Sequence, residues 1–147
     1  MAGRALPTPA EDAVNKRRMR LIVVDDHPEI VRTVTQLLRG HYDIISTSER
    51  GSEALETITV LKPDCVVLDI SMPDLSGIEI AQRLKAAHSH VKIVFLTVHE
   101  DPDYVHEALA AGANGYVVKS QLTSDLPTAL KRAFAGHFFI SPSINMN

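Results

Sequence analysis

Short apolar runs alternate along the chain with segments whose apolar residues recur at helical spacing. The runs at 21–24 and 65–68 are apolar at every position, which is typical of strands buried on both faces. After the first run, the spacing of Ile30, Val34 and Leu38 places apolar side chains on one face of a helix. The pattern predicts five strands, at 21–24, 43–47, 65–68, 91–96 and 115–118.

Capping signals mark where the intervening helices begin. Pro28 suits the first turn of a helix. Ser76, with Glu79 three residues later, has the spacing of a capping box. Asp101 stands before another predicted start, and Ser124 stands before the last. Five helices are expected, near residues 28–38, 52–61, 77–87, 102–111 and 125–134.

Strands that alternate with helices predict an α/β fold with a parallel sheet. Right-handed crossovers leave few topologies, and the common one for five strands is flavodoxin-like, a doubly wound sheet with strand order 2-1-3-4-5. With 147 residues, of which 45% are hydrophobic, the chain suits a single domain with a substantial core. We expect that domain at 20–136, after a mobile leader at 1–19.

A polar residue ends each buried strand of this prediction. Asp25 and Asp26 follow the first strand and Asp69 follows the third, while Thr97 ends the fourth and Lys119 follows the fifth. Parallel strands place their carboxyl ends along one edge of the sheet, so these side chains are expected to converge on one crevice.

The charges in that crevice suggest its chemistry. Clustered carboxylates repel one another, which raises their pKa values unless a cation lies between them. Carboxylate oxygens are ligands that suit Mg²⁺, which also binds phosphate oxygens. Asp69 would then be a nucleophile that forms an aspartyl phosphate, with Lys119 and Thr97 contacting the phosphoryl oxygens.

Four segments carry a family resemblance: Val24-Asp25-Asp26-His27-Pro28, Leu68-Asp69-Ile70-Ser71-Met72-Pro73, Leu96-Thr97, and Ala108-Leu109-Ala110-Ala111-Gly112-Ala113-Asn114-Gly115-Tyr116-Val117-Val118-Lys119. With them the chain resembles a two-component response-regulator receiver domain of the NarL/LuxR subfamily over about 20–136. The resemblance implies the CheY-like form of the fold. Residues 137–147 are similar to the start of the linker that leads, in such proteins, to a helix-turn-helix output domain.

The resemblance also implies a role for each residue of the crevice. Asp69 matches the phosphoacceptor, and Asp26 matches the residue that binds the metal directly. Asp25 matches the acid that holds the metal through water, and the backbone carbonyl of Ser71 matches the remaining protein ligand. Thr97 and Lys119 match the pair that binds the phosphoryl group.

Three positions match residues that act once the phosphoryl group is bound. Tyr116 corresponds to the aromatic switch, which in the family turns inward as the hydroxyl of Thr97 moves onto the phosphoryl group. Ser71 and His99 occupy positions that tune the attack of water on the phosphoaspartate. A strand also favours a tyrosine as an ordinary core residue, which is the alternative for Tyr116.

The function implied is that of a switch. A sensor histidine kinase would phosphorylate Asp69 with Mg²⁺ as cofactor, and the changed domain would control an output, such as transcription through a DNA-binding domain outside this chain. Homodimerisation on phosphorylation is a further expectation. The domain would lose its phosphate by autodephosphorylation and would not be a turnover enzyme.

The composition limits the kinds of binding partner and the compartment that can be expected. A net charge of −3 argues against DNA binding by this chain itself, although a basic run lies at 16–20. The single cysteine, Cys65, lies in an apolar strand and predicts no disulfide, which fits the cytoplasm. No apolar run reaches the length of a membrane span. The histidines lack the spacing of a metal site and are expected to be surface or loop imidazoles: His27, His41, His88, His90, His99, His106 and His137.

Three other functions remain open on this fold. A flavodoxin-like cofactor binder would need a phosphate cradle rich in Ser, Thr and Gly after the first strand, where Asp25 and Asp26 stand instead. A phosphatase with an aspartate nucleophile would place a second acid two residues after Asp69, at the position of Ser71. A receiver that works without phosphorylation, as an interaction module or a phosphate sink, is disfavoured by the complete set of acids.

Overall fold

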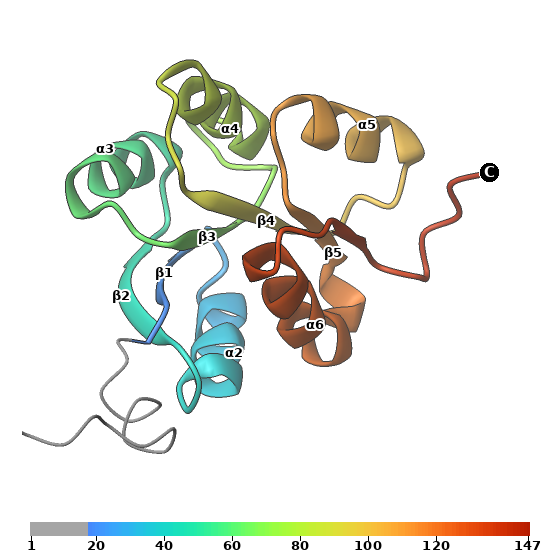
Figure 1. Ribbon diagram of the computed structural model, residues 1–147, viewed down its shortest axis with the longest axis horizontal. Coiled ribbons are helices and arrows are strands. Elements are labelled where there is room, and N and C mark those ends of the chain that lie inside the picture. The colour runs from blue at the N-terminus through green and yellow to red at the C-terminus, as the bar shows by residue number, and fades with distance from the viewer. Residues whose placement is uncertain (1–17) are drawn as a thin grey trace, which may run out of the picture.

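The computed structural model of the chain describes residues 18–147, and a parallel sheet runs through its centre (Figure 1). The order of the strands is β2-β1-β3-β4-β5-β6, and all adjacent pairs are parallel. The strands are β1 (Arg20–Val24), β2 (Asp43–Ser48), β3 (Cys65–Leu68), β4 (Lys92–Thr97), β5 (Gly115–Val118) and β6 (Phe139–Ile140). The predicted order 2-1-3-4-5 is therefore confirmed, with one strand added at its end.

Helices cover both faces of the sheet, as the doubly wound prediction requires (Figure 1). One face carries α2 (Pro28–Leu38) and α6 (Leu122–Phe134). The other carries α3 (Gly51–Leu61), α4 (Gly77–Ala86) and α5 (Pro102–Ala110). Among the helices of residues 18–147, none is both long and apolar enough to cross a bilayer.

The strands supply both cores because successive side chains point to opposite faces. Leu21 and Val23 pack in the core under α2 and α6, whereas Ile22 and Val24 pack in the core under α3, α4 and α5. All four side chains are buried. Continuous apolar runs predicted this two-sided burial, and the packing confirms it.

Two of the predicted helix caps are present, and one is not. The hydroxyl oxygen of Ser76 accepts a hydrogen bond from the backbone N–H of Glu79 at 3.1 Å, and Asp101 accepts one from Asp103 at 2.9 Å. The expected cap at Ser124 is wrong, because α6 begins earlier, directly after a 3₁₀ turn at Lys119–Gln121. That turn lets the chain continue from β5 into the helix without a separate cap.

The sixth strand was not predicted. Residues 139–140 fall in the segment expected to begin a linker, but they pair with Gly115 and Tyr116 on the outer edge of β5. The next residue, Ser141, is fully buried. Its N–H donates to the carbonyl of Tyr116 at 2.9 Å, and its hydroxyl oxygen accepts from the N–H of Val118 at 3.0 Å. A strand of two residues is too short to show a period, so only its partner reveals it.

We expect Ile144→Ser to lower the free energy of unfolding by about 2 kcal/mol. Ile144 is only 7% exposed and packs in the same core as Tyr116 and Val118, so the change removes apolar contacts and buries a hydroxyl. Urea unfolding followed by circular dichroism measures the loss. Asn145→Ser, at the exposed neighbouring position, is the control and is expected to change little. Equal stability of the two variants would show that the tail does not stabilise the domain.

Candidate functional site

The carboxyl ends of β1 and β3 hold two aspartates side by side. The two strands pair in register, with Val24 opposite Leu68, so the residues that follow, Asp25 and Asp69, lie at the same level. Their backbones continue the hydrogen bonding of the sheet: the N–H of Asp69 donates to the carbonyl of Val24 at 2.9 Å, and that of Asp25 to Ser48 at 3.0 Å. Sheet pairing therefore sets the place of both carboxylates, as the strand ends predicted.

Lys119 bridges these two carboxylates. Its Nζ atom lies 2.8 Å from Oδ2 of Asp25 and 3.1 Å from Oδ2 of Asp69. The side chains are 9%, 2% and 3% exposed respectively, so three charges share a site that water scarcely reaches. An ammonium group between two carboxylates offsets their repulsion, which makes their burial possible.

Burial and the neighbouring charges shift the pKa values of Asp69 and Lys119. Desolvation raises the pKa of Asp69 above its usual value, the charge of Asp25 raises it further, and Lys119 opposes both. Burial lowers the pKa of Lys119, but the hydrogen bonds and charges of the two aspartates outweigh that effect and the net pKa is raised. Lys119 thus remains a cation at neutral pH, while Asp69 is held in a surrounding that disfavours its charge.

Asp26 provides the open part of the site. Its side chain is 32% exposed, yet its Oδ1 atom is buried and accepts no hydrogen bond within residues 18–147. Ligand atoms of Asp25, Asp26, Asp69 and His27 all lie within 4.8 Å of one another. A buried carboxylate oxygen that faces the Nδ1 atom of His27 at 3.1 Å without a hydrogen bond, beside two more carboxylates, fits a cation. The cluster can therefore hold a metal ion.

His27 is an exposed loop imidazole, as expected, and it also belongs to this cluster. Its Nδ1 atom lies 2.8 Å from Oδ1 of Asp25 and 3.1 Å from Oδ1 of Asp26, and its side chain is 52% exposed. The hydrogen bond to Asp25 raises the pKa of His27, while Lys119 lowers it. The spacing rules for histidine metal sites missed this residue. Its position directly after two candidate ligands was the signal available.

Thr97 and His99 lie at the end of β4, and Tyr116 lies on the neighbouring strand β5. Thr97 is buried, and its Oγ1 atom accepts a hydrogen bond from the N–H of His99 at 3.3 Å. The hydroxyl of Tyr116 donates to the carbonyl of the same His99 at 2.8 Å. Tyr116 is fully buried, and this burial raises its pKa. The backbone of His99 therefore joins Thr97 to Tyr116, with the tyrosine ring turned inward.

The side chain of His99 closes the other side of the site. Its Nε2 atom lies 2.7 Å from the hydroxyl oxygen of Ser71, and its ring stacks on Tyr104 with the centroids 4.1 Å apart. The N–H of Ser71 in turn donates to Oδ1 of Asp69 at 3.3 Å. Ser71 and His99 thus meet directly beside Asp69, as their sequence positions suggested.

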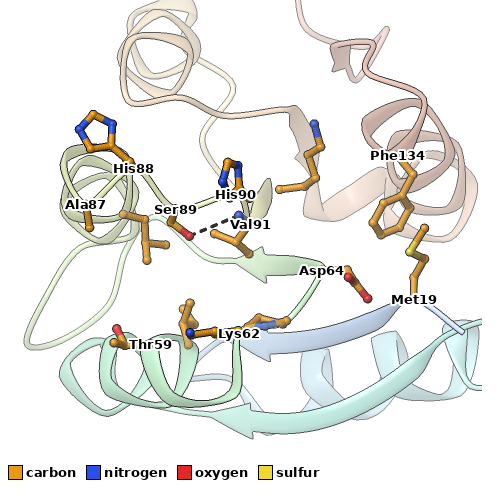
Figure 2. A pocket seen from close by; sticks show the side chains of 14 residues that line it. Met19, Thr59, Lys62, Asp64, Ala87, His88, Ser89, His90, Val91 and Phe134 are labelled. Carbon is orange, nitrogen blue, oxygen red and sulfur yellow. Dashed lines mark hydrogen bonds between the residues drawn. The ribbon is translucent and has the colours of Figure 1, made fainter. Parts of the chain in front are cut away.

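A separate groove of about 720 Å³ lies at the opposite end of the sheet. Figure 2 shows its lining, with His88 and His90 on the loop between α4 and β4, Asp64 before β3, and Phe134 on α6. None of the acids of the crevice lines it. The groove is therefore separate from the crevice at the carboxyl ends of the strands.

Residues 21–131 match the family described as the response regulator receiver domain. The response regulator GacA of Pseudomonas viridiflava is 36% identical over 129 residues, which cover 86% of this chain and 60% of that protein. The transcriptional regulatory protein DegU of Brevibacillus brevis is 29% identical, over 92% of this chain and 58% of that protein. The chain thus spans about 60% of the length of these curated relatives.

A solved structure of similar fold supports the subfamily. It is the two-component response regulator of the LuxR family from Aurantimonas sp. SI85-9A1, with a TM-score of 0.81 and 30% sequence identity. The match covers 86% of this chain and 92% of that one. The predicted resemblance to NarL/LuxR-type receivers is therefore confirmed.

Proposed function

The chain belongs to the response regulator receiver domain family, and on that premise we propose that Asp69 accepts a phosphoryl group from a phosphohistidine of a sensor histidine kinase. The observation that carries the proposal is the buried ion triad in which Lys119 bridges Asp25 and Asp69. The triad presents the carboxylate of Asp69, at the end of β3, together with a fixed cation.

The transfer exchanges one bond to phosphorus for another. An oxygen of Asp69 attacks the phosphorus atom, and the P–N bond to the imidazole breaks as the P–O bond forms. The imidazole nitrogen leaves with the electron pair of the P–N bond. That pair either binds a proton or remains as the lone pair of the nitrogen. Lys119, already beside Asp69, offsets the charge of the arriving phosphoryl oxygens, and the hydroxyl of Thr97 donates to one of them.

We propose Mg²⁺ as the cofactor. Asp26 would bind it directly, since its buried Oδ1 atom accepts no hydrogen bond within residues 18–147. Asp25, 2% exposed and paired with Lys119, would act through water, and Asp69 and the carbonyl of Ser71 would complete the protein ligands. When bound, the ion supplies positive charge that offsets the phosphoryl oxygens.

Loss of the phosphoryl group is assigned to water, with no separate enzyme required. Ser71 and His99 lie beside Asp69 and control the space through which water reaches the phosphorus. This makes the domain a phosphoacceptor with intrinsic autodephosphorylation rather than a turnover enzyme.

The proposed output is transcription, as the names of the relatives suggest. DNA would be contacted by a further domain, and phosphorylation would favour a homodimer. We place the reaction in the cytoplasm, where the single thiol, buried at Cys65, stays reduced.

Incubation with acetyl phosphate and Mg²⁺, followed by intact mass measurement, tests this function. The expected result is a gain of one phosphoryl group that is labile to hydroxylamine and absent when EDTA is added. A cofactor binder, a phosphatase or a receiver that works without phosphorylation would show no stable mass gain. Such a result would overturn the proposal.

We further propose that Thr97 and Tyr116 form the switch. Beryllofluoride bound at Asp69 is expected to slow amide exchange in residues 98–118 by about fivefold or more, because the phosphoryl mimic engages Thr97, which His99 joins to Tyr116. Since the ring is already inward, we expect added protection rather than a large movement. Asp69→Asn with beryllofluoride is the control. Unchanged exchange in a domain shown to hold the mimic would refute the switch.

A further inference from the structure

The loop from Asp69 to Ser76 is tied to the start of a different helix. Both carboxylate oxygens of Asp74 accept hydrogen bonds at the first turn of α3. The N–H of Gly51 donates to Oδ1 at 2.8 Å, the N–H of Ser52 donates to Oδ2 at 3.0 Å, and the hydroxyl of Ser52 also donates to Oδ2. The N-cap residue of α3, Arg50, makes no side-chain cap of its own, so Asp74 caps this helix from 23 positions away.

We propose that Asp74 is a positioning residue for the metal site: by holding this loop against α3, it sets the place of the Ser71 carbonyl. The inference rests on the proposed function, in which that carbonyl is a ligand. Only Met72 and Pro73 separate Ser71 from Asp74. Proline restricts its own φ angle, and the residue before it is restricted too, so this short connection has few conformations. Holding Asp74 therefore limits where Ser71 can lie.

Two glycines allow the loop to seat closely. A Cβ atom at Gly51 would collide with the backbone carbonyl of Leu75, and one at Gly77 would collide with the backbone carbonyl of Asp69. The N–H of Gly77 also donates to the carbonyl of Ile70 at 2.8 Å. The loop therefore packs against backbone at both of its ends, at Gly51 through Leu75 and at Gly77 through Asp69. Such close contact is expected of a loop held in one position.

The charge of Asp74 suits this task. Although the side chain is exposed, the hydroxyl of Ser52 and the N–H groups of Ser52 and Gly51 lower its pKa well below the usual range. The first turn of a helix also favours a negative charge. The carboxylate is therefore ionised at neutral pH, where both oxygens can accept hydrogen bonds.

A simple capping role for α3 is the alternative, and Mg²⁺ binding separates the two. Asp74→Ala is expected to raise the Mg²⁺ concentration at half saturation by about tenfold, as loss of an outer residue that orients a ligand does. The measurement is a Mg²⁺ titration followed by amide chemical shifts of Asp69 to Ser71. At saturating Mg²⁺, the extent of labelling by acetyl phosphate should equal that of the wild type, because Asp69 and Lys119 are intact.

Asn114→Ala is the matched control, because it also removes a side-chain acceptor. The Oδ1 atom of Asn114 accepts a hydrogen bond from the N–H of Ile93 at 2.9 Å, at the amino end of the sheet. It should cost stability in thermal unfolding without changing Mg²⁺ affinity. Asp74→Asn, which keeps one acceptor oxygen, should restore part of the affinity. If Asp74→Ala is less stable but binds Mg²⁺ like the wild type, Asp74 is only a helix cap and the inference fails. If the wild type itself shows no saturable Mg²⁺ binding, the proposed function fails first.

Discussion

Asp69→Asn is expected to reduce acyl phosphate formation by at least about 100-fold, to the background of the assay. The amide has nearly the shape of the carboxylate but lacks the charge and the nucleophilic oxygen. Lys119 keeps its partner Asp25 at 2.8 Å, so the crevice should retain its geometry. Intact mass after incubation with acetyl phosphate and Mg²⁺ is the measurement. Asp103→Asn, an exposed acid in the first turn of α5, is the control and should be labelled like the wild type.

Asp69→Asn should also be more stable than the wild type at neutral pH. Burial and the charge of Asp25 raise the pKa of Asp69 in the folded state, so the folded protein holds this proton more tightly than the unfolded chain does. Stability therefore falls as pH rises from the unfolded pKa through the folded pKa. Asparagine carries no charge and therefore avoids this loss of stability. The free energy of unfolding of Asp69→Asn should exceed that of the wild type at pH values above the folded pKa, and the difference should vanish below the unfolded pKa. Urea unfolding at neutral and acid pH measures this difference in stability. In the labelling experiment, full labelling of Asp69→Asn that is labile to hydroxylamine would show that Asp69 is not the acceptor.

Asp26→Ala is expected to weaken Mg²⁺ binding by about 100-fold. Loss of an outer residue commonly costs 10- to 100-fold in metal affinity, so a direct ligand should reach at least the upper end of that range. The structure makes Asp26 the accessible carboxylate, because Asp25 and Asp69 are both engaged by Lys119. A Mg²⁺ titration followed by amide chemical shifts is the test.

Acidification should weaken binding to the wild type as well, since protons compete for the same oxygens. Asp43→Ala is the control for loss of one negative charge, because this exposed acid begins β2 at the opposite end of the sheet. Equal affinity of wild type and Asp26→Ala would show that Asp26 does not bind the metal directly.

The sequence determined the framework and most of the crevice. Uninterrupted apolar runs such as 65–68 identify strands covered on both faces, and alternation with helices then leaves few sheet orders. A parallel sheet brings the ends of its strands together, so Asp25, Asp69 and Lys119 could be placed in one crevice from their positions alone. The reason is physical: periodicity along the chain reports burial, and burial with strand direction is enough to locate strand ends.

Contacts between separate loops were decided only by the tertiary structure. Asp74 on the first turn of α3 and the inward ring of Tyr116 under the carbonyl of His99 depend on where different segments approach one another. The pairing of residues 139–140 with β5 is a contact of the same kind. No local period encodes them, because each is a single polar or edge contact whose partner is distant in sequence. Register, twist and loop path bring such partners together, and these exist only in the folded chain.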